Sequence, residues 1–148
     1  MADSPRTETE STGVLLVSDE ASVRDEVRSV LAGMNLRVEE MSEGAAVSPA
    51  VKRDPYDLII LDLQVGNMGG MASCMDLRLE ESAGRLPHVP VLMLLDRRAD
   101  VFLARRSGAE GWIIKPLDPI RLRKAIRAIL AGGSYYDTSY QPVPMGTG

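Results

Sequence analysis

The sequence predicts a doubly wound α/β domain, in which five parallel strands form one sheet with helices on both faces. Short apolar runs, typical of strands that are buried on both sides, recur along the chain. Segments with apolar residues at helical spacing separate these runs. The length of 148 residues suits a single domain of this kind.

The first half of the chain contains two of the predicted strand–helix pairs. Residues 14–17 are an apolar run that predicts a buried strand, and residues 23–34 carry apolar side chains at helical spacing. Residues 36–41 mix charges with apolar residues, which favours a weaker strand near the edge of the sheet. Residues 44–53 predict a short helix that Pro49 either interrupts or begins.

The second half repeats the alternation three times. Residues 58–61, 91–95 and 112–114 are the remaining strands, and residues 82–90 form a connector with Gly and Pro. The helices lie over residues 71–79, 100–107 and 119–130. Gly108 is suited to end the second of these helices, and Asp118 followed by Pro119 is suited to begin the third.

Composition and the chain ends predict one soluble domain with two flanking segments. We expect residues 1–12 to be a disordered lead, residues 13–131 to be the domain, and residues 132–148 to be a flexible tail or linker. No apolar run reaches the ~18–20 residues of a membrane span. A single cysteine, Cys74, and the polar N-terminus favour the cytoplasm. The net charge of −4 argues against direct nucleic-acid binding by this segment.

Three charged residues follow or end predicted strands. Asp19 comes after the first strand, Asp62 ends the third, and Lys115 ends the fifth. The carboxyl ends of parallel strands meet at one rim, which is where sites form in such sheets. Two carboxylates there favour a hard cation such as Mg²⁺, and a lysine favours a phosphoryl oxygen. Asp62 could then act as a nucleophile and form an aspartyl phosphate.

Several motifs in order resemble the receiver domain of bacterial two-component response regulators. The acidic turn 17–20, the strand 57–62, the loop 62–70 and above all the segment GAEGWIIKP at 108–116 carry this resemblance. It covers nearly all of residues 13–131. It implies a flavodoxin-like receiver fold and a signalling module that is not an enzyme in the ordinary sense.

The resemblance also implies roles for individual residues. Asp62 matches the phosphoryl acceptor, and Lys115 matches the lysine that contacts the phosphoryl group. Asp19 and Asp62 match carboxylate ligands of Mg²⁺, and Gln64 matches the position that offers its backbone carbonyl to the metal. Pro116 matches a proline that is often preceded by a cis bond.

Departures from the family pattern concern the metal and the switch. Ser18 replaces a second acidic residue, which predicts weaker Mg²⁺ binding unless Glu20 compensates. Leu95 replaces a hydroxyl residue that bonds the phosphoryl group, and Trp112 replaces the switch Tyr or Phe. A flexible Val65-Gly66 stands where Met-Pro is common.

A basic surface predicts either a solvated face or an interface. In receivers the fourth helix, fifth strand and fifth helix form the usual output face, which here carries Arg105, Arg106, Trp112, Arg121 and Lys124. An exposed Trp among arginines suits an interface hot spot for a downstream effector or a homodimer.

Three functions are therefore open. The first is a receiver that accepts a phosphoryl group from a sensor histidine kinase or a phosphotransfer protein. The second is a receiver-fold interaction module that works without phosphorylation. The third, much weaker, is a small enzyme or nucleotide binder using the glycines of residues 66–70, although no Gly-Lys-Ser/Thr follows them. Residues 131–137 resemble a linker to a helix-turn-helix domain, so that the chain is either a stand-alone receiver or part of a longer DNA-binding regulator.

Overall fold

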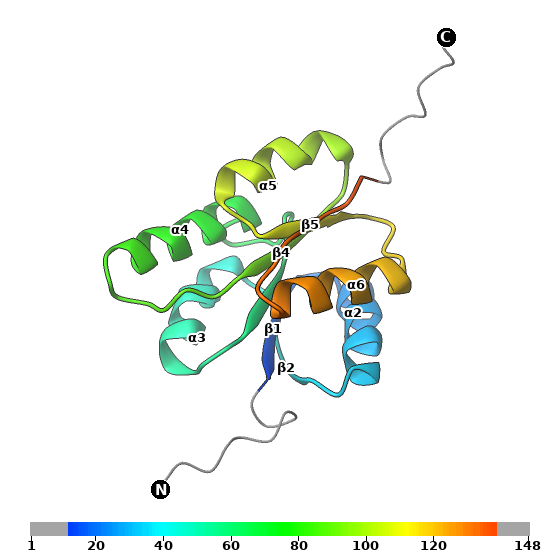
Figure 1. The fold of residues 1–148 in the computed structure, drawn as a ribbon. Coiled ribbons are helices and arrows are strands. Elements are labelled where there is room, and N and C mark those ends of the chain that lie inside the picture. The colour runs from blue at the N-terminus through cyan, green and yellow to red at the C-terminus, as the bar shows by residue number, and fades with distance from the viewer. Residues whose placement is uncertain (1–11, 139–148) are drawn as a thin grey trace, which may run out of the picture.

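The computed structural model, which describes residues 12–138, has a single parallel sheet with helices on both faces (Figure 1). The strand order is β2-β1-β3-β4-β5-β6, and neighbouring strands all pair in parallel. The order reverses between β1 and β3, which creates the switch point at which sites form in open α/β sheets. The predicted fold class is confirmed.

All five predicted strands are present. They are β1 (Gly13–Val17), β2 (Arg37–Met41), β3 (Leu58–Asp62), β4 (Val91–Leu95) and β5 (Gly111–Ile114). Every residue of β1, β3, β4 and β5 is buried, whereas β2 has no buried residue and lies at one edge of the sheet. The mixed polarity of β2 therefore reflects its edge position.

The helices occupy the predicted segments with small differences at their starts. They are α2 (Ala21–Gly33), α3 (Val47–Arg53), α4 (Gly70–Ser82), α5 (Val101–Ser107) and α6 (Pro119–Leu130). Single 3₁₀ turns, Gly44–Ala46 and Arg98–Asp100, lead into α3 and α5. Pro49 lies in the first turn of α3, where the N–H that proline lacks has no partner within the helix.

Helix ends follow from local chemistry. The Asp118 carboxylate accepts a hydrogen bond from the backbone N–H of Ile120 at 3.1 Å, which caps the start of α6. Gly108 ends α5 with a φ of 84°, a left-handed conformation that glycine adopts without strain.

Successive side chains along each strand point to opposite faces of the sheet, so the core consists of two clusters, one on each face. Leu15 and Val17 pack with α3, α4 and α5, and Val14 and Leu16 pack with α2 and α6. The α4 residue Cys74 is fully buried in the first of these clusters, as expected for a residue on the apolar side of its helix. The two clusters hold the sheet between its helices and fix the rim at which β1, β3 and β5 end.

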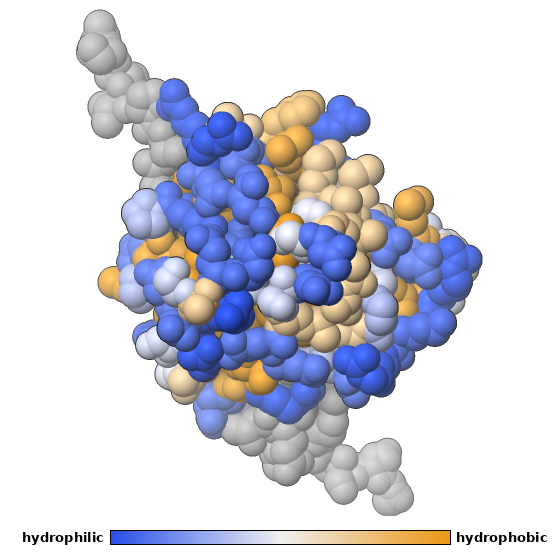
Figure 2. Space-filling view, turned by 180° about the vertical axis from the view of Figure 1, so that it is seen from behind, coloured by the Kyte–Doolittle hydropathy of each residue, from blue (hydrophilic) through white to orange (hydrophobic). Residues whose placement is uncertain are grey.

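Part of the molecular surface is apolar. Figure 2 shows hydrophilic residues over most of the face seen from behind, with an apolar area among them. Large apolar side chains that are exposed on α4, on α5 and in the loop before α4 are Met68, Met75, Leu79 and Phe102. Within residues 12–138, no helix is both long enough and apolar enough to cross a membrane.

A sixth strand, which the sequence did not predict, lies beside β5. Tyr135–Tyr136 form β6, which pairs with Gly111 and Trp112. Residues 135–136 belong to the segment that we expected to be a flexible tail. Gly132, with a φ of 93°, allows the chain to turn back after α6. Residues 1–11 of the expected disordered lead lie outside the described residues. The predicted division into a lead, a domain and a tail stays a prediction.

Gly111 permits the close approach of β6. A Cβ atom at this position would lie 2.4 Å from the backbone oxygen of Tyr135 and 3.0 Å from Ile129 Cδ1. We therefore expect Gly111→Ala to detach β6 and to cost about 1–3 kcal/mol of folding free energy. The amide of Ile114, which donates to Asp137 Oδ2 at 2.9 Å, should then exchange its hydrogen faster, as measured by NMR.

Gly33→Ala is the control for this substitution. A Cβ at Gly33 meets only Arg123, at an ordinary contact distance of 3.5 Å. Unchanged protection of the Ile114 amide in Gly111→Ala would show that β6 does not depend on the missing side chain.

Candidate functional site

The carboxylate of Asp62 lies buried at the end of β3 and is surrounded by hydrogen-bond donors. The hydroxyl of Ser18 donates to its Oδ2 at 2.8 Å, and the backbone N–H of Gln64 donates to its Oδ1 at 3.2 Å. The ammonium of Lys115 donates to both oxygens at 3.1 Å. Asp62 has no exposed surface, so these groups replace the water that would otherwise solvate its charge.

Lys115 follows β5 and contacts several carboxylates. Its Nζ lies 2.9 Å from Asp96, 3.1 Å from Asp62 and 3.5 Å from Glu20. Burial lowers the pKa of Lys115, but the hydrogen bond to Asp96 and the charge of Asp62 outweigh it, and the pKa of Lys115 is raised. The peptide bond between Lys115 and Pro116 is cis.

The expected metal ligands lie along the same rim. The exposed Asp19 accepts a hydrogen bond from the backbone N–H of Gly66 at 3.0 Å, which ties the end of β1 to the loop after β3. Gln64 is linked to Asp62 through its backbone N–H. A cation here would find two carboxylates and a backbone carbonyl. This all-oxygen donor set suits Mg²⁺, which keeps several waters when it binds.

The donor set carries little charge for a metal centre. Within residues 12–138, no cluster of three or more His, Cys, Asp or Glu side chains is arranged to hold a metal ion. Ser18 contributes a neutral hydroxyl to Asp62, and Glu20 lies near Lys115. The side chains of Asp19 and Asp62 are thus of the oxygen-donor type that Mg²⁺ prefers, but they are only two carboxylates.

The switch positions Leu95 and Trp112 belong to one apolar cluster. Leu95 is fully buried, and its side chain offers no hydrogen bond to the rim. The expectation of an exposed Trp112 was wrong, because only 3% of this residue is accessible. Its ring stacks on Tyr136 of β6, with 4.6 Å between the ring centroids, and Arg105 lies over it at 5.4 Å.

The strand β6 also changes the basic face around Trp112. Asp137 is buried, its carboxylate accepts the N–H of Ile114, and it lies 3.9 Å from the guanidinium of Arg121. Arg105, Arg106 and Lys124 remain exposed, whereas Arg121 is half-buried. Of the predicted interaction residues, Trp112 therefore packs against a strand that the chain itself supplies, and Arg121 lies near the residue that follows this strand.

Sequence reasoning missed two residues at this end of the sheet. Asp96 is the first residue after β4, so the rule that selected the ends of the other strands would have found it. Asp137 follows a strand of only two residues, and no pattern in the sequence marked it.

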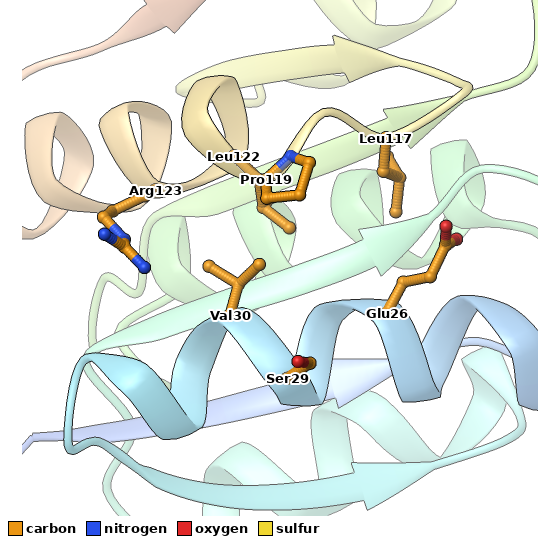
Figure 3. Close-up of a pocket in the computed structure, with 7 residues that line it drawn as sticks. All are labelled: Glu26, Ser29, Val30, Leu117, Pro119, Leu122 and Arg123. Atoms are coloured by element: carbon orange, nitrogen blue, oxygen red, sulfur yellow. The ribbon is translucent and has the colours of Figure 1, made fainter.

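A separate hollow lies between α2 and α6. It has a volume of about 280 Å³, and Figure 3 shows Val30 of α2 pointing towards Leu122 and Pro119. Glu26 and Arg123 lie at its two ends. Its lining mixes apolar side chains with Glu26, Ser29 and Arg123, and it contains no aspartate paired with a lysine, so the rim around Asp62 remains the candidate functional site.

A doubly wound fold with a lysine-paired aspartate at its rim agrees with the receiver domain that the sequence motifs resemble. Residues 14–127 match the response regulator receiver domain, and the chain belongs to this family. It is therefore a signalling module rather than an enzyme.

Relatives of known sequence include regulators that bind DNA. The chain is 33% identical over 119 residues to the DNA-binding response regulator MtrA of Mycobacterium tuberculosis, covering 79% of this chain and 50% of the relative. It is 32% identical over 124 residues to the transcriptional regulatory protein YvrH of Bacillus subtilis, covering 82% and 50%. The chain thus spans about half the length of these relatives.

Solved structures share the fold. A putative response regulator from Chloroflexus aurantiacus has a TM-score of 0.74 at 24% identity, over 81% of this chain and 98% of the other. The receiver domain of the sensor histidine kinase PA1611 from Pseudomonas aeruginosa, solved with a magnesium ion in its active-site cleft, has a TM-score of 0.72 at 20% identity. It covers 81% of this chain and 98% of the other.

The raised pKa of Lys115 predicts a pH-dependent contribution to stability. Lys115 stabilises the folded state below the ordinary lysine pKa of about 10.4, and this contribution is lost as pH rises through its higher folded-state pKa. We expect Lys115→Gln to lower the free energy of unfolding by about 2–4 kcal/mol at neutral pH, since it leaves Asp62 buried without its cation. The deficit should shrink at strongly alkaline pH.

Urea unfolding followed by the fluorescence of Trp112, the single tryptophan, measures this difference. Lys124→Gln removes an exposed lysine of α6 and serves as the control. A Lys115→Gln deficit that stays constant up to strongly alkaline pH would contradict the assignment.

Proposed function

We propose that this protein is a two-component receiver that accepts a phosphoryl group on Asp62 from a sensor histidine kinase or a phosphotransfer protein, in the cytoplasm. The observation that carries the proposal is the contact of Lys115 with both carboxylate oxygens of a fully buried Asp62. Family membership implies a cognate histidine kinase in general. The free, buried thiol of Cys74 agrees with a reducing compartment.

The geometry supports a nucleophilic role for Asp62. A carboxylate oxygen of Asp62 would attack phosphorus, and the leaving group would depart with the electron pair of the broken bond. Lys115 would then stabilise the added negative charge on the phosphoryl oxygens. The hydroxyl of Ser18 would hold the remaining carboxylate oxygen in place, since it already donates to Oδ2.

A magnesium ion would be held by the carboxylates of Asp19 and Asp62 and by the backbone carbonyl of Gln64. When bound, such an ion neutralises charge on the transferring phosphoryl group. Support comes from the chemistry of the donor set and from the PA1611 receiver domain, which was solved with magnesium. With a neutral Ser18 at the rim, the affinity for Mg²⁺ should be lower than it would be with a third carboxylate at that position.

Phosphorylation can be tested with a small donor. After incubation with Mg²⁺ and acetyl phosphate, the intact mass should increase by one phosphoryl group, and the increase should be absent in Asp62→Asn. Asp54→Asn is a matched control, because Asp54 pairs with Arg53 at the end of α3, away from the rim. No mass increase under conditions that label an ordinary receiver would refute the acceptor role.

The magnesium proposal predicts that an acidic residue at position 18 increases the affinity for Mg²⁺. Ser18→Asp should bind Mg²⁺ roughly tenfold more tightly than the natural protein, since carboxylate charge sets the affinity of such sites. Ser18→Ala should bind as the natural protein does. Calorimetric titration with MgCl₂ measures the affinity, thermal unfolding checks that each variant is folded, and EDTA should abolish labelling of Asp62. Equal affinity in Ser18→Asp and Ser18→Ala would contradict these assignments.

A second candidate function is an interaction module that signals without phosphorylation. Leu95 has no hydroxyl to bond a phosphoryl group, and β6 covers Trp112 at the switch position. The output would then depend on the face of Arg105, Arg106, Arg121 and Lys124, which would contact an effector or a second copy of the chain. An unlabelled Asp62 would favour this function.

The relatives suggest a further context for either function. Because the chain spans about half of DNA-binding response regulators such as MtrA, we propose that it serves as the receiver part of a transcription regulator.

A further inference from the structure

Asp96 is the closest carboxylate to Lys115. The distance from Lys115 Nζ to Asp96 Oδ1 is 2.9 Å, compared with 3.1 Å to Asp62 Oδ1. The lysine side chain is mostly buried, with 16% of its surface exposed, so its freedom to move between partners is limited. The cation that would meet the phosphoryl group is therefore already shared between two carboxylates.

The sheet register places Asp96 beside Lys115. Leu95 of β4 is in register with Ile114 of β5, and the backbone N–H of Lys115 donates to the Leu95 carbonyl at 2.7 Å. Asp96 and Lys115 directly follow these two residues, one after the end of each strand. The structure pairs Asp96 with Lys115 in an ion pair.

A phosphoryl group on Asp62 would disturb this arrangement. It carries a charge of about −1.5 to −2 at neutral pH and needs the Lys115 ammonium for its oxygens. The carboxylate of Asp96 competes for the same ammonium and repels an incoming anion. Leu95, which precedes Asp96, has no polar group to offset this repulsion.

We propose that Asp96 is a positioning residue that holds Lys115 in the resting site and thereby slows phosphoryl transfer to Asp62 from small anionic donors. This proposal rests on the acceptor role proposed for Asp62. With acetyl phosphate, an Asp62 oxygen bonds to phosphorus, the bond from phosphorus to the acetyl oxygen breaks, and acetate leaves with the electron pair. Lys115 moves from Asp96 to a phosphoryl oxygen and keeps its proton.

The test compares labelling rates in Asp96→Asn and the natural protein. The substitution removes the charge of Asp96 and preserves its shape. Acetyl phosphate with Mg²⁺ should label Asp96→Asn roughly tenfold faster at low salt, the lower end of the effect that the charge of a site has on the approach of an ion. The difference should narrow at high salt, because added ions screen an electrostatic effect.

Asp25→Asn is the matched control. It removes one carboxylate from α2, where Asp25 pairs with Arg28, and it should be labelled at the natural rate. Labelling of Asp96→Asn at or below the natural rate would overturn the proposal. A faster rate that high salt leaves unchanged would also overturn it, since it would indicate a structural rather than an electrostatic cause.

A second measurement does not require Asp62 to be an acceptor. Brief treatment with acetic anhydride, followed by peptide mass mapping, reports how tightly each lysine is held. Lys115 should react several-fold faster in Asp96→Asn, since a lysine released from an ion pair is more available. Lys52 and Lys124, both exposed, are internal references.

The two measurements separate the two proposals. If neither the natural protein nor Asp96→Asn gains a phosphoryl group, the acceptor role of Asp62 fails. The reactivity of Lys115 then still decides whether Asp96 holds it: a faster reaction supports this contact, and an unchanged reaction overturns it.

Discussion

A fully buried carboxylate must have its charge balanced by nearby groups, and the rim of this sheet is organised around that requirement at Asp62. The balance comes from the cation of Lys115, the hydroxyl of Ser18 and the N–H of Gln64. These groups follow β1, β3 and β5, which end at the same rim because the sheet is parallel. The raised pKa of Lys115 is the reciprocal effect, since carboxylates around a lysine favour its charged form.

The arrangement of strands and the location of the site were predictable from the sequence, because buried apolar runs and the residues that end them follow simple rules. Two features were not. β6 consists of two tyrosines after a glycine pair, and its pairing depends on the space left at Gly111. The burial of Trp112 follows from that strand, because Tyr136 lies on its ring. Both depend on contacts between distant segments rather than on local pattern.

The departures at Leu95 and Trp112 are related through packing. Both side chains belong to the same apolar cluster, which also contains Leu63 directly after Asp62. Close-packed interiors resist gradual deformation, so a shift of one of these side chains requires its neighbours to move. Leu95 has no side-chain hydroxyl, so its link to Leu63 and Trp112 is packing within this cluster.

The parallel direction of β6 determines where the backbone leaves the domain. α6 runs back along the sheet, from the rim where β5 ends towards the opposite ends of the strands. β6 runs parallel to β5, towards the rim, and places Asp137 next to Ile114, the last residue of β5. The described part of the chain therefore finishes on the side of the sheet where β5 ends, beside Ile114.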